Sequence, residues 1–204
     1  VDEADFRKET IYFVVVVRFF SGSVDNDEVG RAGLFDLNPQ PWGNYWGGDL
    51  VGLIAKADYF CSLGVTALWL SPLFEQVDDK LHEFAPMHGY WTRDFKRLNP
   101  HFIDVGDDTS VHRSTTLRRL VETMHARGIK LILDVVCNHS SPEINGSKGV
   151  VLDDGQPLAD FNNDANNFYH HYPSITDWND EFQLIHFEMM GLATFNESNP
   201  DYRR

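Results

Sequence analysis

Three polar side chains with complementary chemistry stand close together in the stretch DVVCNH, residues 134–139. The carboxylate of Asp134 accepts hydrogen bonds, the amide oxygen of Asn138 can ligate a hard cation, and the imidazole of His139 can donate or accept. The stretch directly follows the apolar run IKLIL, which is typical of a buried strand. Such a set can bind hydroxyl groups at the end of a strand. The alternative, a polar cap that only ends the strand, stays open.

The charge of the chain restricts its partners. Its 204 residues carry 17 Lys and Arg against 31 Asp and Glu, a formal net charge of -14. This excess repels nucleic-acid phosphates and anionic lipid headgroups, so neither nucleic acid nor membrane is expected as a partner. Aromatic residues make up 13% of the chain, and flat rings beside carboxylates and amides suit a neutral, hydroxyl-rich ligand such as a sugar. A position in the core would explain any one ring equally well.

Two cysteines and the N-terminal stretch bear on the compartment. Cys61 falls in a helical pattern and Cys137 at a strand end, so both are expected to be buried and reduced rather than part of a disulfide framework. The apolar run at residues 13–17 is far shorter than the roughly 20 residues of a membrane helix. No signal-peptide pattern is visible at the start. The compartment stays unknown, with a secreted or periplasmic location slightly favoured.

Strands and helices alternate between residues 11 and 136. Apolar runs rich in β-branched residues predict three buried parallel strands, at residues 11–17, 65–70 and 129–136. Apolar residues at helical spacing predict two helices, at 50–61 before a cap at Gly64 and at 117–124 before a cap at Gly128.

The predicted loops, residues 21–46 and 71–113, both follow strands, whereas the joins from helix to strand are very short. This asymmetry favours an α/β fold of the TIM-barrel type, with its site at the carboxyl ends of the strands, over an open doubly wound sheet.

The alternation stops after the third strand. Residues 137–198 are rich in Asn, Asp, His and aromatic residues, and we interpret them as an insertion subdomain that follows the barrel portion, residues 1–136. Asn199 and Pro200 suit the N-cap and first turn of a helix, so residues 199–204 are predicted to begin the next barrel helix. His170 and His171 lack partners at a fixed zinc-binding spacing, which favours a polar surface over a metal site.

Five segments resemble signature regions of the α-amylase family, glycoside hydrolase family 13, in matching order and spacing. They are GGDLVGL (47–53), LGVTALWLSP (63–72), HGYWTRDF (88–95), HARGIKLILD (125–134) and DVVCNH (134–139), the last followed by SSP. The resemblance implies a (β/α)8 barrel with an insertion after the third strand. The chain would supply about the first three β/α units, the N-terminal part of the catalytic domain.

By this resemblance, four side chains line the subsite that holds the glucose ring at the cleaved bond: His88, Tyr90, Asp134 and His139. Tyr90 would stack on the ring, His139 would hydrogen-bond it, and Asp134 would orient an arginine close to the nucleophile. The family mechanism retains the anomeric configuration and uses a nucleophilic Asp with an acid Glu. In the family both come from later strands. No catalytic residue is therefore expected in this chain, and the polypeptide alone is predicted to be inactive.

The resemblance also implies calcium as a cofactor. Asn138 would ligate a first ion between barrel and insertion, but Thr194 stands where relatives often have a ligating Asp, which predicts weak binding. A second ion would use Asn26, Asp27 and Asp49. Because calcium takes six to eight oxygens, a solvated acidic loop is the alternative for this second site.

The predicted function is therefore that of a fragment of an α-glucan-acting glycoside hydrolase, with α-glucan or maltooligosaccharide as substrate. Met190 stands where cyclodextrin-forming relatives usually carry an aromatic ring, which favours hydrolysis or simple transfer over cyclisation. Two alternatives stay open: an α-glucanotransferase, and a non-catalytic amylase-like protein that serves binding or assembly.

Overall fold

The computed structural model describes residues 5–38 and 42–203, and it contains two sheets. The first sheet has three parallel strands in the order β1-β2-β5, namely β1 (Ile11–Val14), β2 (Ala67–Leu70) and β5 (Lys130–Leu133). The three predicted parallel strands are thereby confirmed, and each is shorter than the apolar run that predicted it. The intervening helices return the chain to the same end of the sheet, as parallel pairing of successive strands requires.

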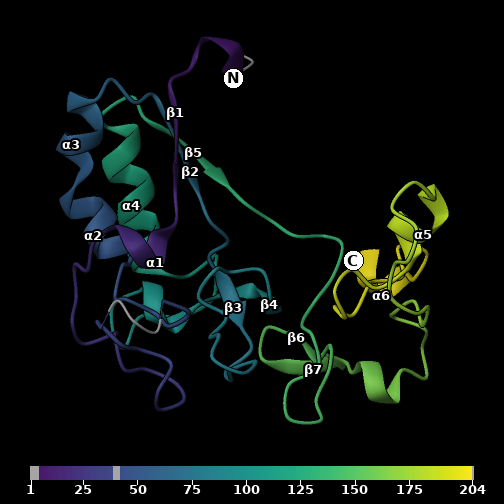
Figure 1. The fold of residues 1–204 in the computed structure, drawn as a ribbon. Coiled ribbons are helices and arrows are strands. Elements are labelled where there is room, and N and C mark those ends of the chain that lie inside the picture. Colours follow the sequence, from purple (N-terminus) through teal and green to yellow (C-terminus); the bar gives the residue numbers. More distant parts are fainter. Residues whose placement is uncertain (1–4, 39–41, 204) are drawn as a thin grey trace.

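Helices cover only one face of this first sheet (Figure 1). They are α2 (Leu50–Ala55), α3 (Ala57–Ser62) and α4 (Thr115–His125). Leu68 and Leu70 point into this layer and are fully buried. On the opposite face, Phe13 is 45% exposed and Trp69 is 40% exposed, and their rings meet edge to face at 5.0 Å. The sheet therefore has one packed face and one open aromatic face.

The first strand ends three residues earlier than its apolar run. Val14 accepts a hydrogen bond from the backbone of Ser71, and the Ser71 hydroxyl accepts one from the backbone N–H of Val16. The chain then turns into α1 (Val16–Phe19), a single helical turn. The prediction of a strand as far as residue 17 was wrong because the Ser71 hydroxyl binds the Val16 N–H in place of a ladder partner, and hydrophobicity alone does not signal a contact between residues so far apart in sequence.

Both predicted helix ends at glycine are confirmed. Gly64 and Gly128 have φ values of +71° and +74°, and the residue after each donates back into the last turn of its helix. This is the left-handed ending for which glycine has no steric penalty. The first predicted helix is broken at Lys56, where φ is -101° and ψ is 14°, so α2 and α3 are separate helices.

The second sheet lies within segments predicted to be irregular. Its order is β3-β4-β6-β7, made of β3 (Phe74–Gln76), β4 (Thr92–Leu98), β6 (Val151–Asp153) and β7 (Gln156–Ala159). The prediction of a loop over residues 71–113 was wrong, since it contains β3 and β4. Strand β3 has only three residues, β4 is mostly polar, and their register is irregular, so their pairing is not signalled by a local apolar pattern.

This second sheet joins two parts of the chain that are far apart in sequence. Strand β4 pairs in parallel with β6 at Asp94 and Leu152. The Asp94 carboxylate is fully buried and accepts a hydrogen bond of 2.7 Å from the backbone of Gly155. The stretch between β2 and β5 is therefore fixed to the stretch that follows β5.

The remaining segments are short. They comprise the 3-10 turns Phe6–Lys8, Pro100–Phe102 and Phe161–Asn163, and the helices α5 (Glu181–His186) and α6 (Pro200–Arg203). Asn199 caps α6, because its side-chain oxygen accepts hydrogen bonds from Asp201 and Tyr202 backbone N–H groups at 2.8 and 3.2 Å. The predicted helix start is thus confirmed.

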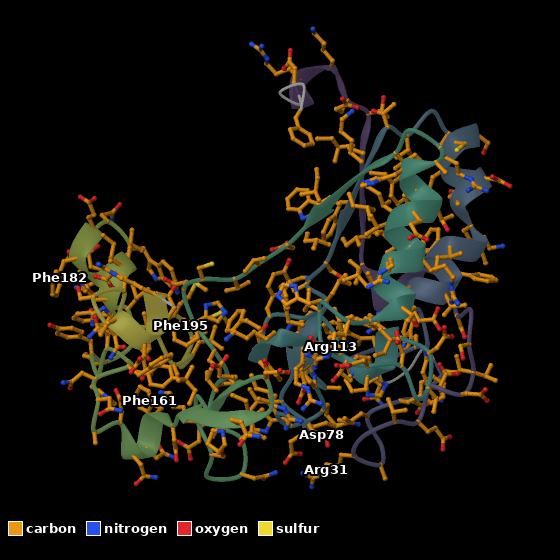
Figure 2. The ribbon with its side chains drawn as sticks, turned by 180° about the vertical axis from the view of Figure 1, so that it is seen from behind. Arg31, Asp78, Arg113, Phe161, Phe182 and Phe195 are labelled. Carbon is orange, nitrogen blue, oxygen red and sulfur yellow. The ribbon has the colours of Figure 1, made fainter. Side chains whose placement is uncertain are left out.

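Figures 1 and 2 show that α5 and α6 lie well away from the first sheet, in the part that includes Phe161, Phe182 and Phe195. A small aromatic core holds this part together. Phe195 stacks on Tyr169 at 5.4 Å and meets the edge of Phe168 at 5.8 Å. All three of these rings are buried.

The cysteine prediction was half wrong. Cys61 and Cys137 are both free, and both are exposed rather than buried. Cys61 lies on the outer side of the α3 turn, and Cys137 follows the end of β5, where the chain leaves the first sheet. In the described part of the chain, no helix is long and apolar enough to cross a bilayer.

Candidate functional site

Tyr90 and Asp134 meet at the carboxyl end of the first sheet. Asp134 follows β5 and extends its ladder, since its backbone N–H donates to Leu70 of β2 at 3.3 Å. The Tyr90 hydroxyl donates to Oδ2 of Asp134 at 3.1 Å. Burial, followed by this bond to a carboxylate, raises the pKa of Tyr90, so the phenol keeps its proton and remains a donor.

His88 lies beside Tyr90 because of a tight glycine turn between them. Gly89 has a φ of +88°, and a Cβ at this position would lie 2.6 Å from the carbonyl oxygen of Pro72. The turn lets Nδ1 of His88 accept a hydrogen bond of 2.9 Å from the backbone of Tyr90. The two rings are nearly parallel, with an interplanar angle of 19° and centroids 5.8 Å apart.

His139 is brought to the same place by backbone contacts on both sides. It forms an isolated β-bridge with Thr194, and the next residue, Ser140, donates from its backbone to Ala193 at 3.0 Å. The Ser140 hydroxyl donates to the carbonyl of Thr92, the first residue of β4, at 2.8 Å. His139 therefore lies next to the turn that carries His88 and Tyr90.

Both imidazoles in this group are held neutral near neutral pH. Burial, with the charge of His139 as a second cause, lowers the pKa of His88 to about 4. Burial also lowers the pKa of His139, and contact with the Tyr90 backbone partly offsets this. The His88 bond supports a neutral ring independently, because Nδ1 accepts from Tyr90 only when it carries no proton.

One ring nitrogen in the group is unsatisfied. Nε2 of His139 is buried and has no hydrogen-bond partner among the described residues, and the residue as a whole is only 6% exposed. A buried polar atom of this kind lowers the stability of the folded state unless a ligand or a water molecule forms a hydrogen bond with it. The structure thus brings together the four side chains predicted to bind sugar, and their binding role stays a prediction.

The predicted first calcium position offers little negative charge from the residues predicted to form it. Asn138 is exposed, and its amide lies 3.4 Å from Nδ1 of its neighbour His139. The hydroxyl of Thr194 donates to the carbonyls of Phe187 and Leu192 at 3.2 and 3.5 Å. Neither Asn138 nor Thr194 is hydrogen-bonded to a carboxylate among the described residues, and calcium binding at Asn138 stays a prediction.

The predicted second calcium position fits a cation better. Oδ1 of Asn26 and Oδ1 of Asp27 are buried oxygens without a hydrogen-bond partner among the described residues. Burial, followed by the charge of Asp49, raises the pKa of Asp27. A Cβ on Gly47 would lie 2.4 Å from Oδ1 of Asp27, so the loop backbone packs directly against this oxygen. Unpaired buried oxygens beside two carboxylates suit a hard cation.

Asp49 has a different role from the one predicted. It caps α2, and its two oxygens accept four hydrogen bonds, from the backbone N–H groups of Gly22, Ser23 and Gly52 and from the Asn26 amide. Its carboxylate is therefore occupied by the loop. Burial raises the pKa of Asp49 in spite of these donors. We assign it to organising the loop rather than to direct ligation.

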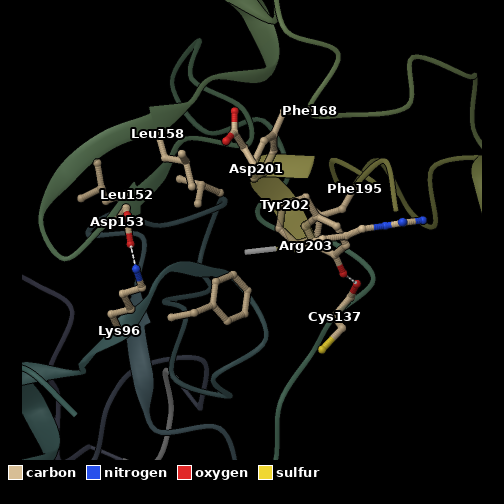
Figure 3. Close-up of a pocket in the computed structure, with 12 residues that line it drawn as sticks. Lys96, Cys137, Leu152, Asp153, Leu158, Phe168, Phe195, Asp201, Tyr202 and Arg203 are labelled. Carbon is tan, nitrogen blue, oxygen red and sulfur yellow. Dashed lines mark hydrogen bonds and ion pairs between the residues drawn. The ribbon is translucent and has the colours of Figure 1, made fainter. Parts of the chain in front are cut away.

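A separate cavity of about 420 Å³ lies between the second sheet and α6 (Figure 3). Its lining is mainly apolar and includes Phe95, Leu158 and Phe195. Two polar contacts border it, the ion pair of Lys96 with Asp153 and the bond from the Tyr202 hydroxyl to the Cys137 carbonyl. None of the four predicted sugar-binding residues lines this cavity, so it is distinct from the candidate site.

The sequence did not reveal two residues that support the site. Ser140 joins the His139 segment to β4, and its only signal was its place in the SSP stretch. Gln76 of β3 holds the other end of the turn, because its side-chain oxygen accepts from the backbone of Trp91 at 2.7 Å. Nothing in the local sequence distinguishes Gln76 from a surface glutamine. Both depend on pairing between distant strands.

The family model described as "Alpha amylase, catalytic domain" matches residues 13–203. A cyclomaltodextrin glucanotransferase of Klebsiella oxytoca is 36% identical over 203 residues, which cover 97% of this chain and 29% of that protein. One from Geobacillus stearothermophilus is 36% identical over 210 residues, covering 98% of this chain and 28% of that protein. The chain therefore spans less than a third of the length of these relatives.

Solved structures agree with the sequence relatives. CldA, described as a cyclomaltodextrin glucanotransferase with a three-domain ABC distribution, has a TM-score of 0.85 and 38% identity over 96% of this chain and 40% of its own. An α-amylase of Anoxybacillus has a TM-score of 0.73 and 29% identity over 98% of this chain and 37% of its own. This chain therefore belongs to the α-amylase family and has the fold of that family's catalytic domain.

Proposed function

We propose that this chain forms one wall of the substrate cleft of an α-glucan-acting enzyme. The observation that carries the proposal is the meeting of Tyr90 with Asp134 and His139, which both lie in the stretch 134–139, far along the chain from Tyr90. A glucose ring has an apolar face and a rim of hydroxyl groups. An aromatic ring beside a carboxylate and a neutral imidazole is complementary to both features.

Each of these side chains has a distinct task in the proposed site. The ring of Tyr90 stacks on the sugar face, and its bond to Asp134 fixes the orientation of that ring. His139 hydrogen-bonds a sugar hydroxyl through Nε2, the buried nitrogen that otherwise has no partner. Asp134 uses its second oxygen to orient an arginine close to the nucleophile.

The chemistry proposed for the whole enzyme is retaining cleavage of an α-glucosidic bond. This mechanism needs a nucleophilic carboxylate and an acid carboxyl about 5 to 5.5 Å apart. We assign neither to this chain, whose residues bind and orient the sugar, so the 204-residue polypeptide by itself is proposed to be inactive. The open face of the first sheet, with Phe13 and Trp69, supports a place for β1, β2 and β5 as three strands of an eight-stranded barrel.

Transfer of the glucosyl unit to another sugar is the second candidate reaction. The names of the sequence relatives favour it, since those proteins are cyclomaltodextrin glucanotransferases. Met190, which is 86% exposed, offers no aromatic ring around which a glucan could coil. We therefore propose hydrolysis or transfer to an open-chain acceptor over cyclisation.

Product analysis with maltoheptaose as substrate tests these assignments. The sample is the intact protein, by which we mean the whole enzyme of which this chain is proposed to form one wall of the cleft. We expect proton NMR to show new reducing ends that first appear in the α configuration, and chromatography to show linear products. Products of inverted configuration would contradict the retaining mechanism. Cyclodextrins as main products would contradict the argument from Met190. If calorimetry shows binding of the sugar but no turnover is detected, the result would support the alternative of a non-catalytic binding protein.

For calcium, we propose that Asn26 and Asp27 hold an ion that stabilises the loop ahead of α2. Calcium bound there would offset the charge of Asp27 and would coordinate two buried oxygens that have no hydrogen-bond partner among the described residues. In the intact protein we expect calcium to raise the melting temperature modestly, and Asp27→Asn to abolish this rise. In EDTA the same variant should melt above the wild type, because the raised pKa of Asp27 shows that its ionised form is unfavourable in the folded loop.

Asp25→Asn is the matched control, since Asp25 is exposed in the same loop. It should keep the wild-type response to calcium. Equal responses of wild type and Asp27→Asn would contradict a site at Asp27. A large rise that Asp27→Asn leaves intact would place the calcium elsewhere.

A further inference from the structure

Three side chains with metal-binding atoms converge near α5 and α6. They are His170, His186 and Glu197, and their ligand atoms all lie within 4.8 Å of one another. Nε2 of His170 lies 2.8 Å from one carboxylate oxygen of Glu197, and Nε2 of His186 lies 4.0 Å from the other. The group belongs neither to the candidate sugar site nor to either predicted calcium position.

The orientation of His186 presents a lone pair to the centre of this group. His186 is the last residue of α5, and its Nδ1 lies 2.9 Å from the carbonyl oxygen of Phe182. A carbonyl only accepts, so Nδ1 carries the proton and Nε2 is left as an acceptor that faces Glu197. A backbone carbonyl that fixes the second nitrogen in this way is the usual support of a metal-binding histidine.

The surroundings hold the two imidazoles in place. His170 is fixed by a backbone hydrogen bond to Thr194 at 2.9 Å, and only 13% of its side chain is exposed. The ring of His186 stacks on Phe182 at 4.3 Å and meets the edge of Tyr172 at 6.1 Å. These ring contacts fix the orientation of the His186 imidazole, although Phe182 and Tyr172 are themselves 49% and 40% exposed.

Glu197 supplies a charge that no cationic side chain neutralises among the described residues. Its carboxylate forms contacts with the two histidines alone, whereas Arg203 donates to its backbone carbonyl at 2.6 Å. Glu197 is 54% exposed at its side chain, so it is free to adjust. In a tetrahedral site with bonds of about 2.0 to 2.1 Å, neighbouring ligand atoms lie roughly 3.3 Å apart, a spacing that small side-chain movements would reach here.

We propose that His170, His186 and Glu197 form a binding site for a divalent transition metal, with zinc as the ion that fits best. Two imidazole nitrogens and one carboxylate are a zinc donor set, and they are too few and too rich in nitrogen for calcium. The ion would join the end of α5 to the segment that leads into α6. Its effect is a structural tie within the part of the molecule that follows β7.

Zinc titration of the intact protein tests this site. Metal is first removed with a chelator, and zinc is then titrated against a chromophoric competitor. We expect the wild type to bind one equivalent of zinc. His170→Ala and His186→Ala should each lower the affinity for zinc at least about 100-fold, because loss of a partner that only supports a ligand can already cost that much. Cobalt replaces zinc in a second titration, where the wild type should show the visible absorption of tetrahedral cobalt and both variants should lose it.

His171→Ala is the matched control. His171 is the adjacent histidine, but its Nε2 lies 3.0 Å from Asp164 and it takes no part in the group. This variant should bind zinc as the wild type does. Equal affinity in the wild type, His170→Ala and His186→Ala, or equal loss in His171→Ala, would overturn the proposal. Circular dichroism of the metal-free variants shows whether any loss of binding results from unfolding, and His186→Gln, a milder change, must then lose the same equivalent for the site to stand.

Discussion

Asp134→Asn and His139→Ala in the intact protein are each expected to lower kcat on maltoheptaose by about 100-fold or more, the effect of removing one well-placed polar group from a site where charge develops. Asn has the shape of Asp and can still accept from the Tyr90 hydroxyl, so Asp134→Asn removes a charge and little else. His139→Ala removes the unpartnered Nε2 without stranding a new buried donor. The melting temperature should therefore change little. Turnover and thermal melting measured on the same samples check this.

Cys137→Ser is the control for this pair. Cys137 lies in the same stretch, is exposed and is free, so its replacement should leave kcat and KM unchanged. A loss of kcat in parallel with a large loss of melting temperature would indicate that Asp134 and His139 act only in folding. Wild-type turnover in Asp134→Asn would remove this side chain from the proposed site.

Gly52→Ala is expected to cost about 3 kcal/mol of folding free energy or more, the upper part of the range for overpacked positions. Gly52 lies in α2, and a Cβ there would be 1.8 Å from the carbonyl oxygen of Phe20 and 3.1 Å from Asp49. The obstacle is backbone, which cannot move aside as a flexible side chain could. Urea denaturation of the intact protein measures the loss as a lower midpoint.

Gly64→Ala is the matched glycine control. It has a left-handed φ of +71° but no atom within 4 Å of an added Cβ, so only the backbone strain of about 1 to 2 kcal/mol applies. A larger loss for Gly64→Ala than for Gly52→Ala would contradict the close approach of α2 to the backbone of Phe20. The comparison separates crowding from strain, since both variants add the same methyl group.

The second sheet could not be predicted from the local sequence pattern. Strand β4 reads TRDFKRL, a polar sequence, yet Thr92, Asp94 and Leu98 are buried. The side chain of Asp94 is satisfied by the backbone of Gly155, far along the chain. Strand propensity reflects fit to a partner more than any preference of the backbone itself. A strand whose partner is distant and whose buried groups are polar therefore gives no readable signal.

Both metal assignments show the same limit. The sequence suggested Asp49 as a calcium ligand, but in the structure its carboxylate accepts hydrogen bonds from backbone N–H groups of the loop and of α2. It gave no reason to connect His170 with His186 and Glu197, because the three come from separate segments without a fixed spacing. The type of a possible ligand atom can be read from the sequence. Whether that atom is already occupied by a hydrogen bond depends on its neighbours in space.

Local sequence pattern was sufficient to predict the parallel strands β1, β2 and β5 and the glycine ends of the helices, and the five signature segments were sufficient to predict the family. The strands and the helix ends follow from short-range causes, namely continuous apolar runs, helical spacing and the need for glycine at positive φ. Tertiary structure alone decided that Tyr90 donates to Asp134, that His139 keeps an unpartnered nitrogen and that β4 pairs with β6. The physical reason is that hydrogen-bond satisfaction and burial are properties of a whole neighbourhood, which chain folding assembles from residues far apart in sequence.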